Sequence, residues 1–156
     1  MPTDTAKLSV AEFNRIARER MPFFAFLGLR IESLTRERVV MRAEHRDEFL
    51  RPGGTVAGPI MMGLADSAFY AVILANLGPI ELAVTTNLSI NFLRKPPPGD
   101  LLCSAGLLKL GKRLAVCECG IYKATAAAGT SANAALDADA LVAHATGTYS
   151  IPSQTG

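Results

Sequence analysis

Asp66 stands alone in a long uncharged segment. It is the only acidic or basic side chain in the 29 residues from Pro52 to Ile80, where the pattern predicts an apolar helix. Aspartate is a poor helix former, and a buried carboxylate is costly unless it is paired, hydrogen-bonded or protonated. Two interpretations fit: a polar stripe that Asp66 shares with Ser67 or Gly63 on an exposed helix face, or a functional carboxylate. A functional carboxylate could act as a general base or as a nucleophile.

A glycine-rich loop leads into the predicted helix. Residues 53–59 read Gly-Gly-Thr-Val-Ala-Gly-Pro. The first backbone N–H groups of a helix are unpaired and lie at the positive end of its dipole, where they can stabilise a carbonyl oxygen that gains negative charge. Gly58 precedes Asp66 by eight residues, so a substrate carbonyl at the helix start and a carboxylate further along would form a hydrolytic arrangement. Taken alone, such a loop is typical of a simple turn.

Other catalytic chemistries lack their residues. The sequence contains no G-x-S-x-G elbow, no P-loop and no G-x-G-x-x-G fingerprint. The only histidines, His45 and His144, lie outside the loop and the helix and are interpreted as structural. The odd number of cysteines, Cys103, Cys117 and Cys119, indicates reduced thiols that serve as small core side chains. Zinc would need more clustered ligands, so no metal is expected.

Capping signals and periodicity divide the chain into elements. Ser9 and Glu12 form a capping box for a helix over 9–20, which Pro22 ends, and residues 59–77 predict a long apolar helix. The remaining ranges predict strands over 29–34, 39–44, 82–93, 100–110, 113–123 and 141–151, a type II′ turn at Gly111-Lys112, an irregular segment over 46–59 and a loop over 124–138.

The alternation over 82–93 is the strongest strand signal. Apolar and polar residues alternate from end to end with a period of two. An uninterrupted strand of this pattern has Thr86 and Leu88 on one face and Thr85 and Asn87 on the other.

The long helix determines the fold class. It is apolar nearly all round, so it must be buried on most sides. The six predicted strands can achieve this only if one antiparallel sheet wraps around the helix, which predicts an α+β fold in a single domain over 1–156, with its core at about 25–151. Apolar residues make up 49% of the chain and charged residues 19%. This composition favours an apolar subunit interface, and we expect an obligate dimer or tetramer.

Charge and targeting signals narrow the partners and the location. Sixteen basic and 14 acidic residues give a net charge of +2 without a run of either sign, and Trp is absent. No basic stripe or stacking platform for nucleic acid is visible. The N-terminus lacks the regions of a signal peptide, and no apolar stretch of about 18 residues is free of glycine and proline. We expect a cytoplasmic protein that binds neither nucleic acid nor a membrane.

A series of short segments is specific as a set: GTVAGP, LADSA, VTTNLSINFLR, LGKRLA and VAHATGTY, at 54–59, 64–68, 84–94, 110–115 and 142–149. Together they resemble the hotdog-fold acyl-CoA thioesterases of the phenylacetate-degradation (PaaI-like) type, over roughly residues 25–151. The resemblance implies a curled antiparallel sheet around one long central helix, here with a short N-terminal helix. It also implies a dimer with joined sheets, often paired into a tetramer, and active sites at the dimer interface.

The resemblance also implies roles for single residues. Asp66 matches the helix carboxylate that acts as nucleophile or activates water, and Gly58 matches the backbone N–H that polarises the thioester carbonyl. Thr85 falls near the Ser or Thr that helps place the water, although Thr86 beside it leaves the register open.

Three positions depart from the family pattern. The loop His of the family falls on Ala57, the second Gly of that motif falls on Pro59, and the loop Asn falls near Arg51. Gly58 N–H is then the only clear oxyanion donor, unless Arg51 substitutes. One lost donor of this type can cost about 10²–10³ in rate.

Two basic pairs could contact the phosphates of coenzyme A. Arg94-Lys95 and Lys112-Arg113 lie at predicted strand ends, where they are either solvated turn charges or phosphate ligands. The expected substrate contacts are Arg51, Ala57, Pro59, Thr86, Asn87, Arg94, Lys95, Lys112 and Arg113. No cofactor is expected beyond the coenzyme A of the substrate.

The leading hypothesis is therefore an enzyme, an acyl-CoA thioesterase. The alternative is a non-catalytic acyl-CoA binding protein that keeps the pocket without the imidazole. A regulatory hotdog domain would need a DNA-binding segment, which the helix over 9–20 is too short to provide. Small helix residues at Gly63, Ala65 and Ala68 are a weak hint of room for a bulky or aromatic acyl group.

Overall fold

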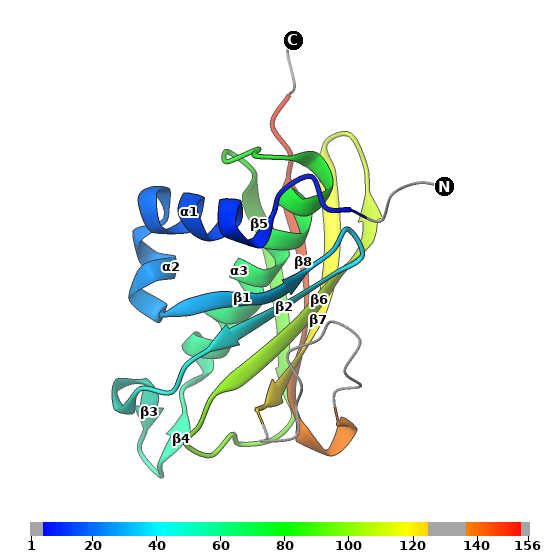
Figure 1. Ribbon diagram of the computed structural model, residues 1–156. Helices are drawn as coiled ribbons and strands as arrows, with labels where there is room; N and C mark the ends of the chain where they lie inside the picture. The colour runs from blue at the N-terminus through cyan, green and yellow to red at the C-terminus, as the bar shows by residue number, and fades with distance from the viewer. Residues whose placement is uncertain (1–4, 125–136, 154–156) are drawn as a thin grey trace.

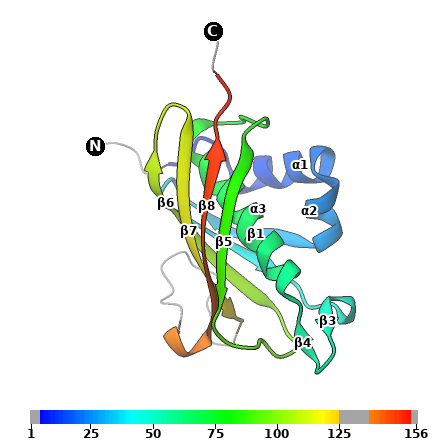
Figure 2. The same cartoon turned by 180° about the vertical axis from the view of Figure 1, so that it is seen from behind.

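The structure, a computed structural model, describes residues 5–124 and 137–153. Six antiparallel strands form one sheet in the order β1-β2-β6-β7-β8-β5. They are β1 (Leu29–Leu34), β2 (Arg38–Ala43), β5 (Val84–Phe92), β6 (Leu101–Leu110), β7 (Leu114–Lys123) and β8 (Leu141–Ser150). The sheet curls around the long helix α3 (Gly58–Leu77), as Figures 1 and 2 show. The predicted hotdog architecture, an α+β fold with a curled sheet around one central helix, is confirmed.

α3 is the core of the molecule. Every residue from Leu64 to Ala75 is buried except Asp66. In length and composition α3 could cross a membrane, but most of its apolar stretch is buried inside the fold. It packs against β2, β6, β7 and β8, so its apolar character is explained by the sheet that covers it.

β5 is an edge strand with a β-bulge at Thr86. It pairs with β8 on one side, and the pairing register shifts between Thr85 and Asn87. The extra residue exchanges the two faces of the strand, so that Thr85 lies on the same inward face as Leu88 and Ile90. The uninterrupted alternation predicted for this strand is therefore wrong.

The N-terminal segment forms two helices instead of one. In α1 (Val10–Arg20), Ser9 and Glu12 make both hydrogen bonds of the predicted capping box. Pro22 ends α1, as predicted, but it also begins a second helix, α2 (Pro22–Leu27). Proline suits the first turn of a helix because the N–H it lacks would have no partner there.

The segment between β2 and α3 is more regular than predicted. It contains a 3₁₀-helix, η1 (Asp47–Phe49), and a small hairpin of β3 (Leu50–Arg51) and β4 (Thr55–Val56). Gly53 and Gly54 form its turn with φ values of 95° and 76°, in the region that favours glycine.

The β6–β7 turn also differs from the prediction. Gly111 N–H donates to Leu114 O at 2.9 Å, so Lys112 and Arg113 occupy the turn and Gly111 has no positive φ. The type II′ turn at Gly111-Lys112 is wrong, because a register shift near Leu108 moves the turn by one residue. Most of the loop predicted over 124–138 lies outside the described residues, and η2 (Ala138–Ala140) follows it.

The cysteines are part of the core, as predicted. Cys103, Cys117 and Cys119 are free thiols buried in the sheet. Burial raises the pKa of Cys117 to about 12, so this thiol stays protonated and packs as a small apolar side chain.

Candidate active site

The Asp66 carboxylate is held by two hydroxyl groups. Thr85 Oγ1 donates to Asp66 Oδ1 at 2.7 Å, and the Tyr149 hydroxyl donates to the same oxygen at 2.8 Å. Asp66 itself is only half-buried, whereas its neighbour Ser67 is buried. The interpretation of Asp66 as part of an exposed polar stripe with Ser67 is therefore wrong. The carboxylate instead lies in a site where two hydroxyl groups donate to it.

Tyr149 was not predicted from the sequence. It is 3% exposed, on the inward face of β8. Burial, and then the charge of Asp66, raises the pKa of Tyr149 well above its usual range, so its hydroxyl stays protonated and donates. The available signal was its alternation with Ala145 and Gly147, since a tyrosine on a core-facing position needs a partner for its hydroxyl.

A cavity of about 270 Å³ opens beside Asp66. Glu81 at its margin forms an ion pair with Arg20 at 3.0 Å. The apolar and aromatic lining of this cavity comes from α2 and its N-cap residue, from α3, and from the start of β5 and the residue before it: Met21, Phe23, Phe24, Tyr70, Ala83 and Val84. The unpredicted helix α2 thus supplies one wall, and the cavity suits an uncharged, apolar group.

Gly58 lies in a different cleft, of about 250 Å³, whose lining includes Arg51, Arg94 and Lys95. As the first residue of α3, Gly58 has no intrahelical acceptor for its N–H. A Cβ built on Gly58 would lie 3.1 Å from the Phe92 ring, so glycine permits this close packing. The cleft combines the first backbone N–H of α3 with three cationic side chains, which suits a negatively charged group.

One chain does not bring Gly58 and Asp66 to the same substrate atom. Eight residues of α-helix separate them by about 12 Å along the axis, and the two residues line separate cavities. A reacting carbonyl must lie about 3 Å from both its oxyanion donor and its base or nucleophile. The hydrolytic arrangement predicted along a single helix is therefore wrong as an arrangement within one chain.

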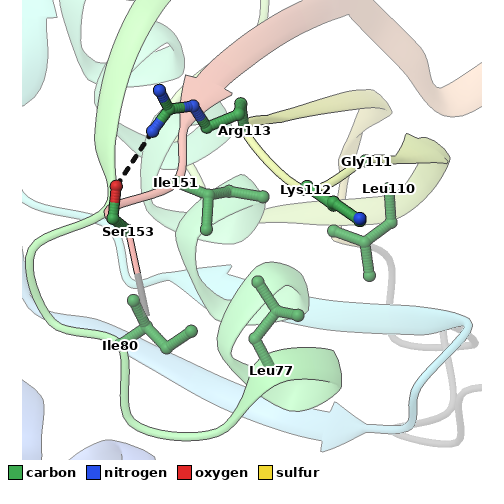
Figure 3. Close-up of a pocket in the computed structure, with 8 residues that line it drawn as sticks. All are labelled: Leu77, Ile80, Leu110, Gly111, Lys112, Arg113, Ile151 and Ser153. Atoms are coloured by element: carbon green, nitrogen blue, oxygen red, sulfur yellow. Dashed lines mark hydrogen bonds between the residues drawn. The ribbon is translucent and has the colours of Figure 1, made fainter. Parts of the chain in front are cut away.

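The turn between β6 and β7 lies at the opposite end of the molecule from β3 and β4 (Figures 1 and 2). Its residues Lys112 and Arg113 line a third cavity, of about 650 Å³. In Figure 3 Arg113 lies above Ile151 and Lys112 to its right, with Leu77 and Ile80 below. Arg113 Nη1 donates to Ser153 Oγ at 2.9 Å. The two basic pairs thus belong to different cavities.

Four predicted contact residues do not line these three cavities. The hydroxyl of Thr86 donates to the backbone of β8, and Asn87 is exposed. Ala57 is the N-cap residue of α3, without a side-chain cap, and Pro59 follows in the first turn. Thr85, rather than Thr86, is the threonine that faces the site.

Comparison with known proteins points to one family. The profile of the thioesterase superfamily matches residues 53–130, which include Gly58, Asp66 and Thr85. The crystal structure of a candidate thioesterase from Silicibacter sp. TM1040 is similar with a TM-score of 0.78 and 38% identity, over 97% of this chain and 96% of the other.

Two further relatives agree with this match. A single-residue mutant of the phenylacetic acid degradation protein PaaI from Thermus thermophilus has a TM-score of 0.66 at 26% identity, over 84% of this chain and 99% of that chain. A candidate esterase of Saccharolobus solfataricus is 29% identical over 116 residues, 74% of this chain and 75% of that protein.

Proposed function

Because the chain belongs to the thioesterase superfamily, as a hotdog protein of the PaaI-like type, we propose that it hydrolyses an acyl-CoA thioester to a free acid and coenzyme A. The observation that carries this proposal is the Asp66 carboxylate. It is the one residue in the middle of α3 that is not buried, it accepts hydrogen bonds from two hydroxyls, and it borders an apolar cavity.

Asp66 activates the attack on the thioester in one of two ways. As a general base it takes a proton from water, whose oxygen attacks the carbonyl carbon. As a nucleophile it attacks that carbon itself and forms an acyl-aspartyl anhydride, which water then hydrolyses. In both routes the C–S bond breaks, the thiolate of coenzyme A leaves, and the backbone N–H of Gly58 stabilises the oxyanion.

The site is completed by a second copy of the chain. Among the described strands β5 lies at an edge of the sheet, and two copies of an edge strand can pair antiparallel about a two-fold axis. This pairing brings the Phe92 end of one β5, next to Gly58, towards the Val84 end of the other, next to Asp66. Exposed apolar side chains on α2, α3 and β5 support this interface: Phe23, Phe26, Met62, Val84 and Phe92.

A binding protein without activity is the second candidate. Ala57 occupies the position of the family's loop His, and the loop Asn falls near Arg51, which leaves Gly58 N–H as the main oxyanion donor. Arg51 lines the same cleft as Gly58, and its guanidinium is a suitable second donor there. This observation favours the enzyme over the binding protein.

A screen of CoA thioesters with thiol detection tests the proposal. We expect hydrolysis of at least one apolar acyl-CoA. The relative rates in the same screen identify the acyl group that the enzyme prefers. If no thioester is hydrolysed, but CoA esters raise the melting temperature, the binding protein replaces the enzyme.

Lys112 and Arg113 are proposed to contact the phosphates of coenzyme A, with the apolar floor of their cavity under the adenine. Exposed charge contacts contribute roughly 0.5–1 kcal/mol each, and reversal adds repulsion, so Lys112→Glu with Arg113→Glu raises KM for acyl-CoA about tenfold or more. The salt dependence of KM flattens. Thioesters of pantetheine, which lack the nucleotide, keep their KM.

The pair Arg94→Glu with Lys95→Glu is the matched comparison, because it reverses two cations in the cleft of Gly58. A selective loss of acyl-CoA affinity in this variant, and not in the variant at Lys112 and Arg113, would mean that the phosphates bind in the cleft of Gly58. Equal losses on both substrates in either variant would mean that its residues do not contact the nucleotide.

A cytoplasmic location is also proposed. Its support is chemical: all three cysteines are free, and reduced thiols are typical of the cytoplasm.

A further inference from the structure

Two cross-strand neighbours hold the carboxylate of Asp66, and one of them binds the residue twice. Thr85 on β5 and Tyr149 on β8 are direct partners in the ladder. The Tyr149 hydroxyl lies 2.8 Å from Asp66 Oδ1 and also 2.8 Å from the backbone oxygen of Asp66. We propose that Tyr149 is the positioning residue of the Asp66 carboxylate, which it fixes so that Oδ1 is held and Oδ2 reacts. This inference rests on the proposed function.

The hydrogen bonds divide the two carboxylate oxygens into different roles. Thr85 and Tyr149 both donate to Oδ1, at 2.7 and 2.8 Å. Among the side-chain hydrogen bonds of residues 5–124 and 137–153, none reaches Oδ2. Two donors on one oxygen stabilise negative charge there and stop the carboxylate from rotating. Oδ2 is then the oxygen that takes a proton from water or attacks the thioester.

Tyr149 fixes Asp66 more firmly than Thr85 can. A threonine hydroxyl rotates about a single bond, whereas the tyrosine oxygen lies at the end of a rigid ring that is itself buried. The Tyr149 ring lies 6.4 Å from that of Tyr70. By contacting both the carboxylate and the backbone oxygen of one residue, Tyr149 ties the side-chain orientation of Asp66 to the axis of α3.

Tyr149→Phe tests this role because it removes the hydroxyl and keeps the ring. A hydrogen bond to a charged group is lost in the reacting state, so kcat falls about 10–100-fold while KM stays within about threefold. A merely structural role would not produce this split between kcat and KM.

Tyr70→Phe is the matched control. It removes a second tyrosine hydroxyl from the same cavity, but this hydroxyl donates to Glu81 O at 3.1 Å and does not touch Asp66. The NMR chemical shift of the Asp66 carboxyl carbon in Tyr70→Phe stays at its wild-type value. An equal change of this chemical shift in Tyr70→Phe and Tyr149→Phe would overturn the specific role of Tyr149.

The double variant separates action through Asp66 from independent action. If Tyr149 acts through Asp66, Tyr149→Phe causes no further loss of kcat in an Asp66→Asn background. Independent losses in the two variants, or a kcat of Tyr149→Phe within about twofold of the wild type, contradict the inference.

The NMR chemical shift of the Asp66 carboxyl carbon at a fixed, neutral pH gives a readout that does not need turnover. It differs from the wild type in Tyr149→Phe, which lacks one of the two donors to Oδ1, and is unchanged in Tyr70→Phe. An equal chemical shift in the wild type and Tyr149→Phe overturns the positioning role. A wild type that hydrolyses no thioester overturns the proposed function instead, and the chemical shift still decides the role of Tyr149.

Discussion

Asp66→Asn lowers kcat by about 10²–10⁴, the usual contribution of a positioned base, with little change in KM. The variant keeps the shape of the side chain and an amide oxygen that can accept from Thr85 and Tyr149, but it replaces the reacting oxygen with an NH₂ group. Within residues 52–80 no other side chain supplies a base or nucleophile near neutral pH. Steady-state hydrolysis of the best acyl-CoA from the screen measures this loss.

The free energy of unfolding of Asp66→Asn holds or rises, because an uncharged amide is easier to bury than a carboxylate. Thermal unfolding in parallel therefore separates a lost base from a lost fold. Asp47→Asn is the control for the same chemical change, since the Asp47 side chain is 93% exposed and pairs only with His45 among the described salt bridges. If Asp66→Asn keeps activity within about threefold, Asp66 is structural and the mechanism fails.

The elements that rest on local signals could be predicted from the sequence. Asp66 is the only charged side chain between Pro52 and Ile80. The lack of other charges predicts a buried helix, because burying a charged side chain is costly. For the same reason Asp66 stands out as the residue that needs an explanation. Gly58 follows from the same segment, since a helix start leaves N–H groups free. The curled sheet follows from the need to cover a helix that is apolar all round.

The features that depend on register could not be predicted. A period of two assigns Thr85 and Leu88 to opposite faces, and one bulge residue at Thr86 reverses this assignment. Tyr149 is 83 residues from Asp66 in sequence, so only the pairing of β5 with β8 brings the two together. Local patterns single out the Asp66 carboxylate, but the hydroxyls that donate to it depend on which strands are neighbours.

A mixed dimer of two inactive variants recovers about half of the activity of the wild-type dimer, because one of its two sites has both functional groups intact. The first parent is Asp66→Asn. The second is Gly58→Pro, which removes the backbone donor at the first helical position, where proline is tolerated. The loss of one oxyanion donor costs about 10²–10³ in kcat.

Gly58→Ala controls for the added side chain. Its Cβ meets the same Phe92 ring at 3.1 Å, but the alanine keeps the N–H. The ring is the end of a side chain and can move by a few tenths of an ångström, so Gly58→Ala retains far more activity than Gly58→Pro. Similar losses in both would assign the effect to packing against Phe92 and not to the oxyanion donor.

The mixed dimer is obtained by co-expressing the two parents with different tags and purifying on both. In this dimer the Gly58 of the Asp66→Asn chain and the Asp66 of the Gly58→Pro chain together form one complete site. If both groups acted from the same chain, no site would be complete and the mixed dimer would be as inactive as its parents. Light scattering of the wild type gives at least twice the 16.5 kDa chain mass, and a value near 16.5 kDa at micromolar concentration would likewise contradict a site shared between two copies.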